Sequence, residues 1–251
     1  MSNSKLVTYI WKGSKNNCNP RNHKIDRITI HHWAGNGTIE NCCNVIIGRG
    51  GSVNYLIDDI GSMGLMIDED LRAWTSNSPA NDHRAVTIEA SNNCTTKDGD
   101  KCGWTVSDKT LVSLIKLCTD ICQRNGKKKL IWLGSKEKAL SYVPKADEMV
   151  LTLHKWFVST ACPGPYLEGK MPYIAQQVTA ALVPAPETNF RVKATHGCYT
   201  YASKDGKPPV FGPYSTGAQW TIEKIITYAG IQWGKVKGAE LWVRMSDVTK
   251  V

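Results

Sequence analysis

The chain has 251 residues, of which 41% are hydrophobic and 21% charged, and it is long enough to bury a substantial core. Its formal net charge of +9 and its pI of about 9.1 favour an anionic partner such as nucleic acid, a membrane surface or a bacterial wall rich in phosphate and carboxylate. No window approaches the roughly 18 apolar residues of a membrane helix, so the sequence predicts no transmembrane segment.

Residues 1–15 contain no apolar core flanked by a small-residue cleavage site, so we expect no signal peptide and a protein made and folded in the cytoplasm. The nine cysteines are odd in number and do not form paired C-x-x-C hooks, which argues against a structural zinc finger. Most of them are expected to be reduced, small core residues.

The first half of the chain shows strand patterns around one short helix. Turn residues separate the elements, and each strand is rich in β-branched or other apolar residues. The expected elements are a strand at 27–30 that ends at His31, a helix at 38–46 capped by Thr38, strands at 52–58 and 63–67, a loop holding Trp74, Asn77, Pro79 and Asn81, and a strand at 85–90.

The clearest helix covers residues 108–125, because apolar residues recur at a spacing of three to four between a capping Ser107 and Gly126. A strand is expected at 130–133. Residues 145–149 lead into a strand that ends at His154, and a last helix is expected at 170–182.

The composition changes after this helix. Residues 183–189 hold two prolines and no apolar periodicity, which indicates a linker. Residues 190–251 contain short alternating runs without a helical pattern, which predicts a small β-barrel. We therefore expect an α/β domain at 1–182 and an all-β domain at 190–251.

Histidine and cysteine side chains stand where two of the predicted strands end. His154 closes one strand and Cys162 follows eight residues later, while His31 and His32 close another. Imidazole and thiolate are the side chains that zinc prefers, and three protein ligands with an open fourth position describe a catalytic zinc. Strand alternation puts His31 and His32 on opposite faces, so only one of them can be the ligand, and periodicity does not choose between them.

Glu89 is the second anomaly, because a carboxylate inside an apolar strand is costly to bury without a partner. Facing a zinc ion, it is suited to take a proton from water; facing solvent, it has no catalytic role. Cys162 has a rival interpretation as a nucleophile with His154 as its base. That alternative leaves His31 and Glu89 without a role.

Three separated motifs together resemble the type 2 N-acetylmuramoyl-L-alanine amidases, a family that includes peptidoglycan-recognition proteins and many phage endolysins. They are ITIHHWAG at 28–35, AVTIE at 85–89, and His154 with seven residues before Cys162-Pro163-Gly164. The resemblance covers about residues 20–182. It implies a central mixed β-sheet flanked by helices, with one zinc ion on its open face.

The resemblance also implies roles for single residues. The zinc ligands fall on His31, His154 and Cys162, the catalytic acid on Glu89, and a residue that polarises the substrate carbonyl on Thr160. Lower-ranked candidates for substrate contact are His32, Trp74, Asn81 and Tyr55. Some branches of the family use a tyrosine instead of the glutamate, and Tyr55 and its neighbours match that pattern poorly.

The C-terminal segment is similar to bacterial SH3-like domains, mainly through WGKV at 233–236 and LWV at 241–243. This likeness implies a wall-binding role for Trp233 and Trp242, with a wall polymer or a stem peptide as the ligand. A structural cap without a ligand is the alternative.

The sequence thus predicts a zinc-dependent hydrolase that cuts the amide between N-acetylmuramic acid and L-alanine of peptidoglycan. The absence of a signal peptide fits a phage endolysin that reaches the wall after release through the membrane, or a bacterial autolysin exported by other means. The alternatives are a non-catalytic wall-recognition protein on the same scaffold and a wall cysteine peptidase that uses Cys162 and His154. No nucleic-acid partner is expected, because neither helix-turn-helix nor zinc-finger spacing occurs.

Overall fold

The computed structural model describes residues 3–15, 17–93, 104–182, 189–204 and 209–251. The chain divides into two compact units, Met1–Val183 and Pro184–Val251. The expected linker at 183–189 lies outside the described residues except for Asn189, as do Cys94 and Cys102. Among the described helices, none combines the length and hydropathy needed to cross a membrane.

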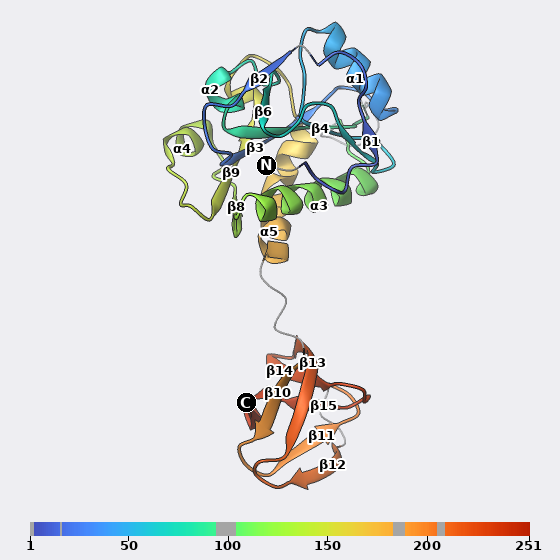
Figure 1. Cartoon of the computed structure of the whole chain (residues 1–251), viewed down its shortest axis with the longest axis vertical. Helices are drawn as coiled ribbons and strands as arrows, with labels where there is room; N and C mark the ends of the chain where they lie inside the picture. The colour runs from blue at the N-terminus through green and yellow to red at the C-terminus, as the bar shows by residue number, and fades with distance from the viewer. Residues whose placement is uncertain (1–2, 16, 94–103, 183–188, 205–208) are drawn as a thin grey trace. The chain divides into compact units, whose positions relative to one another are not determined.

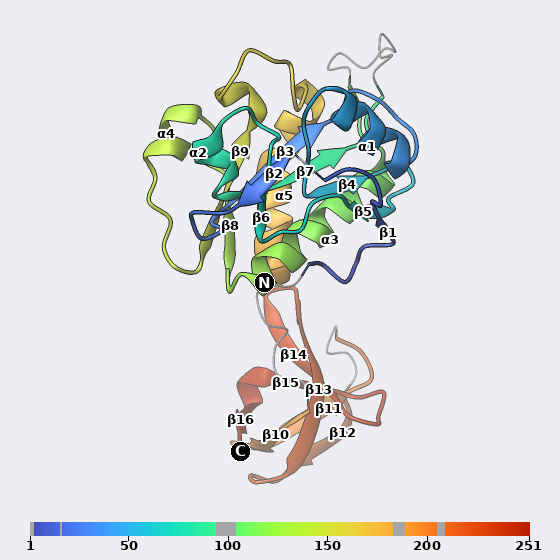
Figure 2. The ribbon, with the colours of Figure 1, turned by 45° about the horizontal axis from the view of Figure 1, so that its top comes forward.

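The first unit is built on a seven-stranded mixed sheet with the order β1-β5-β4-β7-β3-β9-β8 (Figures 1 and 2). Only the β4–β5 pair is antiparallel. The strands are β1 (Tyr9–Ile10), β3 (Arg27–His32), β4 (Tyr55–Ile57), β5 (Met63–Leu65), β7 (Ala85–Ala90), β8 (Lys129–Ile131) and β9 (Glu148–Leu153). A separate two-stranded sheet pairs β2 (Cys18–Pro20) with β6 (Leu71–Ala73).

The helices of this unit cover both faces of the sheet. One core gathers apolar side chains of α3 (Asp108–Arg124), α5 (Pro165–Leu182) and the strands. A smaller core packs α1 (Ile39–Gly48) against Leu56 and neighbouring segments. Two short helices, α2 (Pro79–Asp82) and α4 (Lys136–Ser141), and a 3-10 turn η1 (His154–Trp156) complete the unit. The expected α/β architecture with a central mixed sheet is confirmed.

Local signals explain where the helices begin. The side chains of Thr38 and Ser107 accept the backbone N–H of Asn41 and Thr110, so each satisfies an orphan donor of its helix. Helix α5 starts earlier than predicted, at Pro165, directly after a left-handed Gly164. Proline fits the first turn of a helix, where its missing N–H costs nothing.

The second unit is a seven-stranded antiparallel sheet with the order β12-β11-β15-β14-β13-β10-β16. Its elements are β10 (Phe190–Ala194), β11 (Cys198–Tyr201), β12 (Pro209–Tyr214), β13 (Gln219–Tyr228), β14 (Ile231–Val236), β15 (Trp242–Arg244), η2 (Met245–Asp247) and β16 (Val248–Lys250). Val192, Ile222 and Val243 form the centre of its small core. An all-β unit is therefore present, as the alternating runs predict.

Candidate metal centre and catalytic cavity

Strand alternation sorts the side chains of β3 and β7 between the two faces of the sheet. Ile28, Ile30 and Ile88 belong to the core that α3 and α5 cover. His31 and Glu89, one residue further along, therefore point to the opposite face. The polar face of the central sheet is where the candidate site lies.

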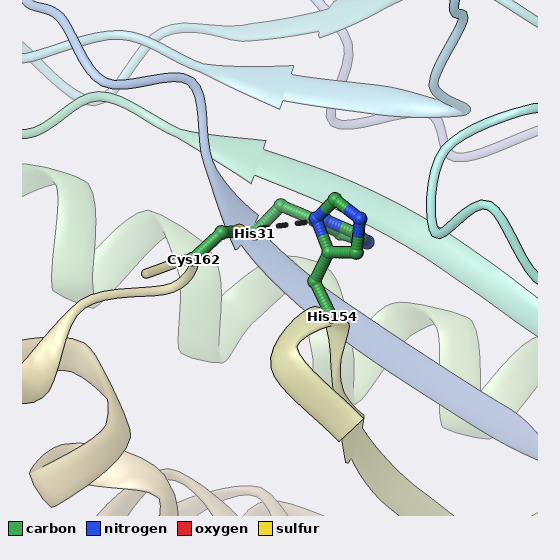
Figure 3. A group of neighbouring side chains, drawn as sticks. All are labelled: His31, His154 and Cys162. Atoms are coloured by element: carbon green, nitrogen blue, oxygen red, sulfur yellow. Dashed lines mark hydrogen bonds between the residues drawn. The ribbon is translucent and has the colours of Figure 1, made fainter. Parts of the chain in front are cut away.

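His31, His154 and Cys162 converge at the carboxyl ends of two neighbouring parallel strands. His31 is the second-to-last residue of β3, His154 is the first residue of η1 directly after β9, and Cys162 lies in the loop before α5 (Figure 3). One ligand atom from each residue lies within 4.8 Å of the others. The Cys162 Sγ is 3.6 Å from His31 Nδ1, and the two imidazole centroids are 4.8 Å apart.

The donor atoms of this group have few other partners among the described residues. His31 is fully buried, yet its Nε2 has no hydrogen-bond partner. Neither ring nitrogen of His154 bonds to a described residue, and the Cys162 Sγ accepts one backbone N–H, from His32, at 3.4 Å. Buried polar atoms in folded proteins are normally satisfied, so three under-used donors at one point fit a metal ion. Two imidazoles and a thiolate are a ligand set that suits zinc.

The titration of these groups follows from their burial. Desolvation lowers the pKa of His31 well below its ordinary value, with the neighbouring His154 adding to the effect, so His31 is neutral, as a metal ligand must be. Burial also lowers the pKa of His154. The pKa of the Cys162 thiol is raised, mainly by burial and further by the charge of Glu89. A cation at this point would reverse that shift, because it stabilises the thiolate.

Glu89 borders the group from the next strand. It is paired with His31 in the β3–β7 register, only 8% exposed, and its Oε2 has no partner among the described residues. Burial raises its pKa to about 8, while the charge of Arg49 acts in the opposite direction. A carboxyl with a pKa near neutrality is suited to both take and return a proton.

A cavity of about 520 Å³ opens beside this group, and His154, Glu89 and Thr160 all line it. The Thr160 Oγ1 accepts the backbone N–H of Cys162 at 3.2 Å, which leaves its hydroxyl proton available to a ligand. Across the cavity, Trp74 is 43% exposed and donates from its ring nitrogen to Asn19. The cavity therefore combines one residue of the metal-ligand group, a carboxyl, a hydroxyl donor and an aromatic ring.

The family model of the N-acetylmuramoyl-L-alanine amidases (Amidase_2) matches residues 21–165, which include the three candidate metal ligands, Glu89 and Thr160. The chain belongs to this family. No curated protein sequence gives a significant match.

Solved structures of amidases and related proteins resemble parts of this amidase-family chain. The endolysin N-acetylmuramoyl-L-alanine amidase LysCS from Clostridium intestinale URNW is 19% identical, with 66% of this chain and 96% of that chain covered and a TM-score of 0.44. The amidase AmiD from E. coli, in a complex with anhydro-N-acetylmuramic acid-L-Ala-D-gamma-Glu-L-Lys, is 17% identical, with 65% of this chain and 60% of that chain covered and a TM-score of 0.44. The Drosophila peptidoglycan recognition protein SA is 14% identical, with 62% of this chain and 82% of that chain covered and a TM-score of 0.41. The family assignment rests on the sequence match, not on these superpositions.

Three lower-ranked candidates do not line the cavity of the amidase unit, and their expected contact with substrate is corrected. His32 points to the other face, against Asn92 and the ring of Trp104. Tyr55 is fully buried, and its hydroxyl lies 2.6 Å from Glu69.

Asn81 is the third of these candidates. It belongs to helix α2 rather than to a loop, and it is 1% exposed. Its amide bonds to Thr29 and Arg27 in a polar network on the same face of the sheet as His31. The sequence pattern marks it as a loop residue because a four-residue helix leaves too short a signal.

Sequence reasoning missed two cationic residues of the cavity, Arg49 and Arg72. The Arg49 residue caps the carboxyl end of α1, and the Arg72 guanidinium lies 5.6 Å from the centroid of Trp74. Neither forms an ion pair with a described carboxylate. Arg49 stands just before the Gly50-Gly51 turn and Arg72 is the central residue of the short strand β6, and neither position carries a sequence pattern that marks a binding site.

In the second unit, Trp233 is a core residue rather than an exposed contact for the wall. It is 1% exposed, packs edge-on against Tyr201 and lies under the Arg244 guanidinium. A buried ring has no surface for a polymer, so the expected role of Trp233 is corrected. Trp242 is half-buried on β15, and its wall-binding role stays a prediction.

Proposed function

We propose that the chain is a zinc-dependent N-acetylmuramoyl-L-alanine amidase that cuts the bond between N-acetylmuramic acid and L-alanine in peptidoglycan. The observation that carries the proposal is the convergence of His31, His154 and Cys162 within 4.8 Å, beside a cavity that His154 and Glu89 both line. Family membership supports the substrate class. A recognition protein needs neither the thiol ligand nor a buried carboxyl beside it.

The residues of the chain divide the chemistry between them. A zinc ion held by the three ligands would polarise the scissile carbonyl and lower the pKa of water to about 7. Glu89 takes the proton of the attacking water and returns it to the leaving amine of L-alanine. The Thr160 hydroxyl donates to the carbonyl oxygen as negative charge develops there.

The walls of the cavity suit a peptide that carries carboxylates. Arg49 and Arg72 add positive charge and form no ion pair with a carboxylate of the described residues, and Trp74 offers an aromatic face. The net charge of +9 fits work on an anionic wall. We further propose that the all-β unit is an SH3-like wall-binding domain, and that the protein acts as an endolysin or autolysin that reaches the wall after its synthesis in the host cytoplasm.

The test is hydrolysis of purified wall by the full chain, with released amino groups and reducing sugars measured separately. The expected result is new amino termini on L-alanine without reducing sugar, lost with a chelator and restored by zinc. Glu89→Gln should lower the turnover by about 10²–10⁴-fold while zinc remains bound at one equivalent. Reducing sugar without new amino termini would refute the amidase.

Two other outcomes would assign the alternative functions. Activity that survives metal removal but is lost on thiol alkylation would make Cys162 a nucleophile with His154 as its base. Tight binding of wall without any cleavage, in the presence of zinc, would make the chain a recognition protein. A matched Glu137→Gln variant, changed on the exposed surface of α4, controls for loss of a carboxylate in general.

A further inference from the structure

A second hollow lies in the first unit, along the edge strand β8 and helix α5. It has a volume of about 450 Å³ and shares no lining residue with the catalytic cavity. The Thr179 hydroxyl hydrogen-bonds to both the N–H and the carbonyl of Leu130 at 3.1 Å, which fastens α5 to β8. We call it the β8–α5 groove; it is lined by Leu130, Trp132, Pro172, Ala175, Gln176, Thr179 and Ala180.

The β8–α5 groove has an aromatic residue in a fixed orientation. Trp132 is half-buried and stacks on Trp156, with ring centroids 5.4 Å apart and an interplanar angle of 13°. Exposed Gln176 and Ala180 form part of the opposite wall, on α5. A ring held by stacking loses little conformational entropy when a ligand covers it, so Trp132 is a preformed platform for the apolar face of a sugar.

The segment that contains β8 carries an excess of positive charge. Residues 127–148 contain six lysines and three carboxylates. Lys127 donates to the carbonyl of Ala146, and the other five lysines are exposed and form no ion pair with a described carboxylate: Lys128, Lys129, Lys136, Lys138 and Lys145. Of the carboxylates, Glu148 is buried, accepts the Tyr142 hydroxyl, and lies opposite Lys129 in the β8–β9 register, where the charges of Lys145 and Lys129 help to lower its pKa. Lys128 and Lys129 directly precede the groove residue Leu130.

We propose that the β8–α5 groove and its lysines form a second binding site, for an anionic glycopolymer built of sugar and phosphate repeats. A sugar ring covers Trp132 in the groove, while Lys128 and Lys129 contact the phosphates on either side. Charge complementarity selects this partner, because a neutral glycan would gain nothing from the lysines and a bare polyphosphate nothing from the tryptophan. The site lies outside the catalytic cavity, so it holds the enzyme on the wall rather than selecting the bond that is cut.

The lysines have one competing explanation. β8 is the edge of the seven-stranded sheet, and charged side chains on an edge strand prevent pairing with another chain. That role predicts self-association when Lys128 and Lys129 are neutralised, with no change in polymer binding. The competing role is therefore measurable by sedimentation.

The binding experiment uses the full chain and a purified poly(ribitol phosphate) wall polymer that carries sugar substituents, alongside the same polymer stripped of its sugars. The variant Lys128→Gln with Lys129→Gln should bind the glycosylated polymer about tenfold more weakly at low salt, since each exposed ion pair has a modest strength. The matched control, Lys109→Gln with Lys116→Gln, removes the same charge from exposed positions of α3 and should change the affinity much less. Equal losses in the two variants would overturn the site in favour of a general charge effect.

The groove is tested at Ala180, whose exposed position on α5 tolerates a longer side chain without loss of core packing. Ala180→Glu and Ala180→Gln should both weaken binding of the glycosylated polymer, and the glutamate should weaken it more. Both variants should weaken binding of the stripped polymer much less. Unchanged binding in both variants would refute the groove. Cleavage of a soluble muropeptide should stay at the wild-type rate in every variant, so failure of this proposal is distinguishable from failure of the amidase.

Discussion

His31 and Glu89 occupy paired positions on the adjacent parallel strands β3 and β7, and both side chains point to the polar face of the sheet. Each keeps one buried atom without a hydrogen bond among the described residues, Nε2 of His31 and Oε2 of Glu89. A folded protein rarely leaves two such atoms next to each other unless a bound species satisfies them. The pairing therefore argues for a site where a ligand replaces the missing partners.

Glu89→Gln should stabilise the metal-free protein at neutral pH. The folded pKa of about 8 lies above the ordinary value of 4.5, so the folded state binds a proton that the unfolded state releases. The contribution of Glu89 is fully present below pH 4.5 and is lost as the pH rises through 8. At pH 7 the loss is on the order of 3 kcal/mol, which thermal unfolding with and without the substitution measures.

Glu148 provides the control with the opposite sign. The Tyr142 hydroxyl and the backbone N–H of Lys145 lower its pKa, so its contribution is present at neutral pH and is lost as the pH falls through the folded pKa. Glu148→Gln should therefore destabilise the protein at pH 7. A Glu89→Gln variant that is less stable than wild type at pH 7 would contradict the burial argument.

Long elements with a strong pattern could be predicted from the sequence. The strand at 85–90 and the helix from 108 agree with the structure because each buries one continuous apolar stripe. Several short elements were missed, among them β1, β6 and α4. Two to six residues contain too few side chains for a period to show, and tertiary pairing decides their conformation.

The site divides along the same line. His31, Glu89 and His154 could be named because each stands at a strand end or interrupts an apolar run, and Cys162 could be named from its spacing to His154. The residue pattern alone left His31 and His32 equivalent; the family resemblance chose His31, and the strand register places His31 on the face of the site. The two cavity arginines, Arg49 and Arg72, could not be predicted. Arg72, for example, reaches the cavity only through the β2–β6 pairing, a contact between distant segments.

Zinc should raise the unfolding temperature of the wild-type chain and leave that of Cys162→Ser nearly unchanged. A ligand that binds only the folded state stabilises it by about 2.7 kcal/mol at a hundredfold excess over its Kd. Replacing the thiol removes one of three protein ligands. Cobalt substitution supplies a direct measure, since only the thiolate gives an intense near-ultraviolet charge-transfer band.

Cys42→Ser is the matched control, because that thiol is also buried but belongs to the core beside α1. It should lose core packing without losing the cobalt band. A full band in Cys162→Ser would remove Cys162 from the ligand set.

Arg49→Gln and Arg72→Gln should raise the KM for a stem-peptide substrate more than they lower kcat. Both arginines line the cavity and form no ion pair within the described part of the chain, so they suit substrate carboxylates away from the reacting carbonyl. An increase of about tenfold in KM corresponds to one modest charge contact. Steady-state kinetics with free and with amidated stem peptides separates the effects, because amidation should abolish the difference between variant and wild type. Equal KM increases for both substrates would show that the arginines instead stabilise the local fold around the cavity.

Tyr55→Phe should lower stability and leave kcat unchanged. The Tyr55 hydroxyl donates to Glu69 at 2.6 Å and accepts the backbone N–H of Ser4 at 2.8 Å, so its removal leaves a buried carboxylate and an amide with one partner fewer. The expected loss is about 1–3 kcal/mol in the free energy of unfolding. Tyr173→Phe, at a 46% exposed position of α5, should change neither quantity. A Tyr55→Phe variant with wild-type stability and reduced kcat would instead return this tyrosine to the catalytic machinery, which its burial in the core shared with α3 and α5 argues against.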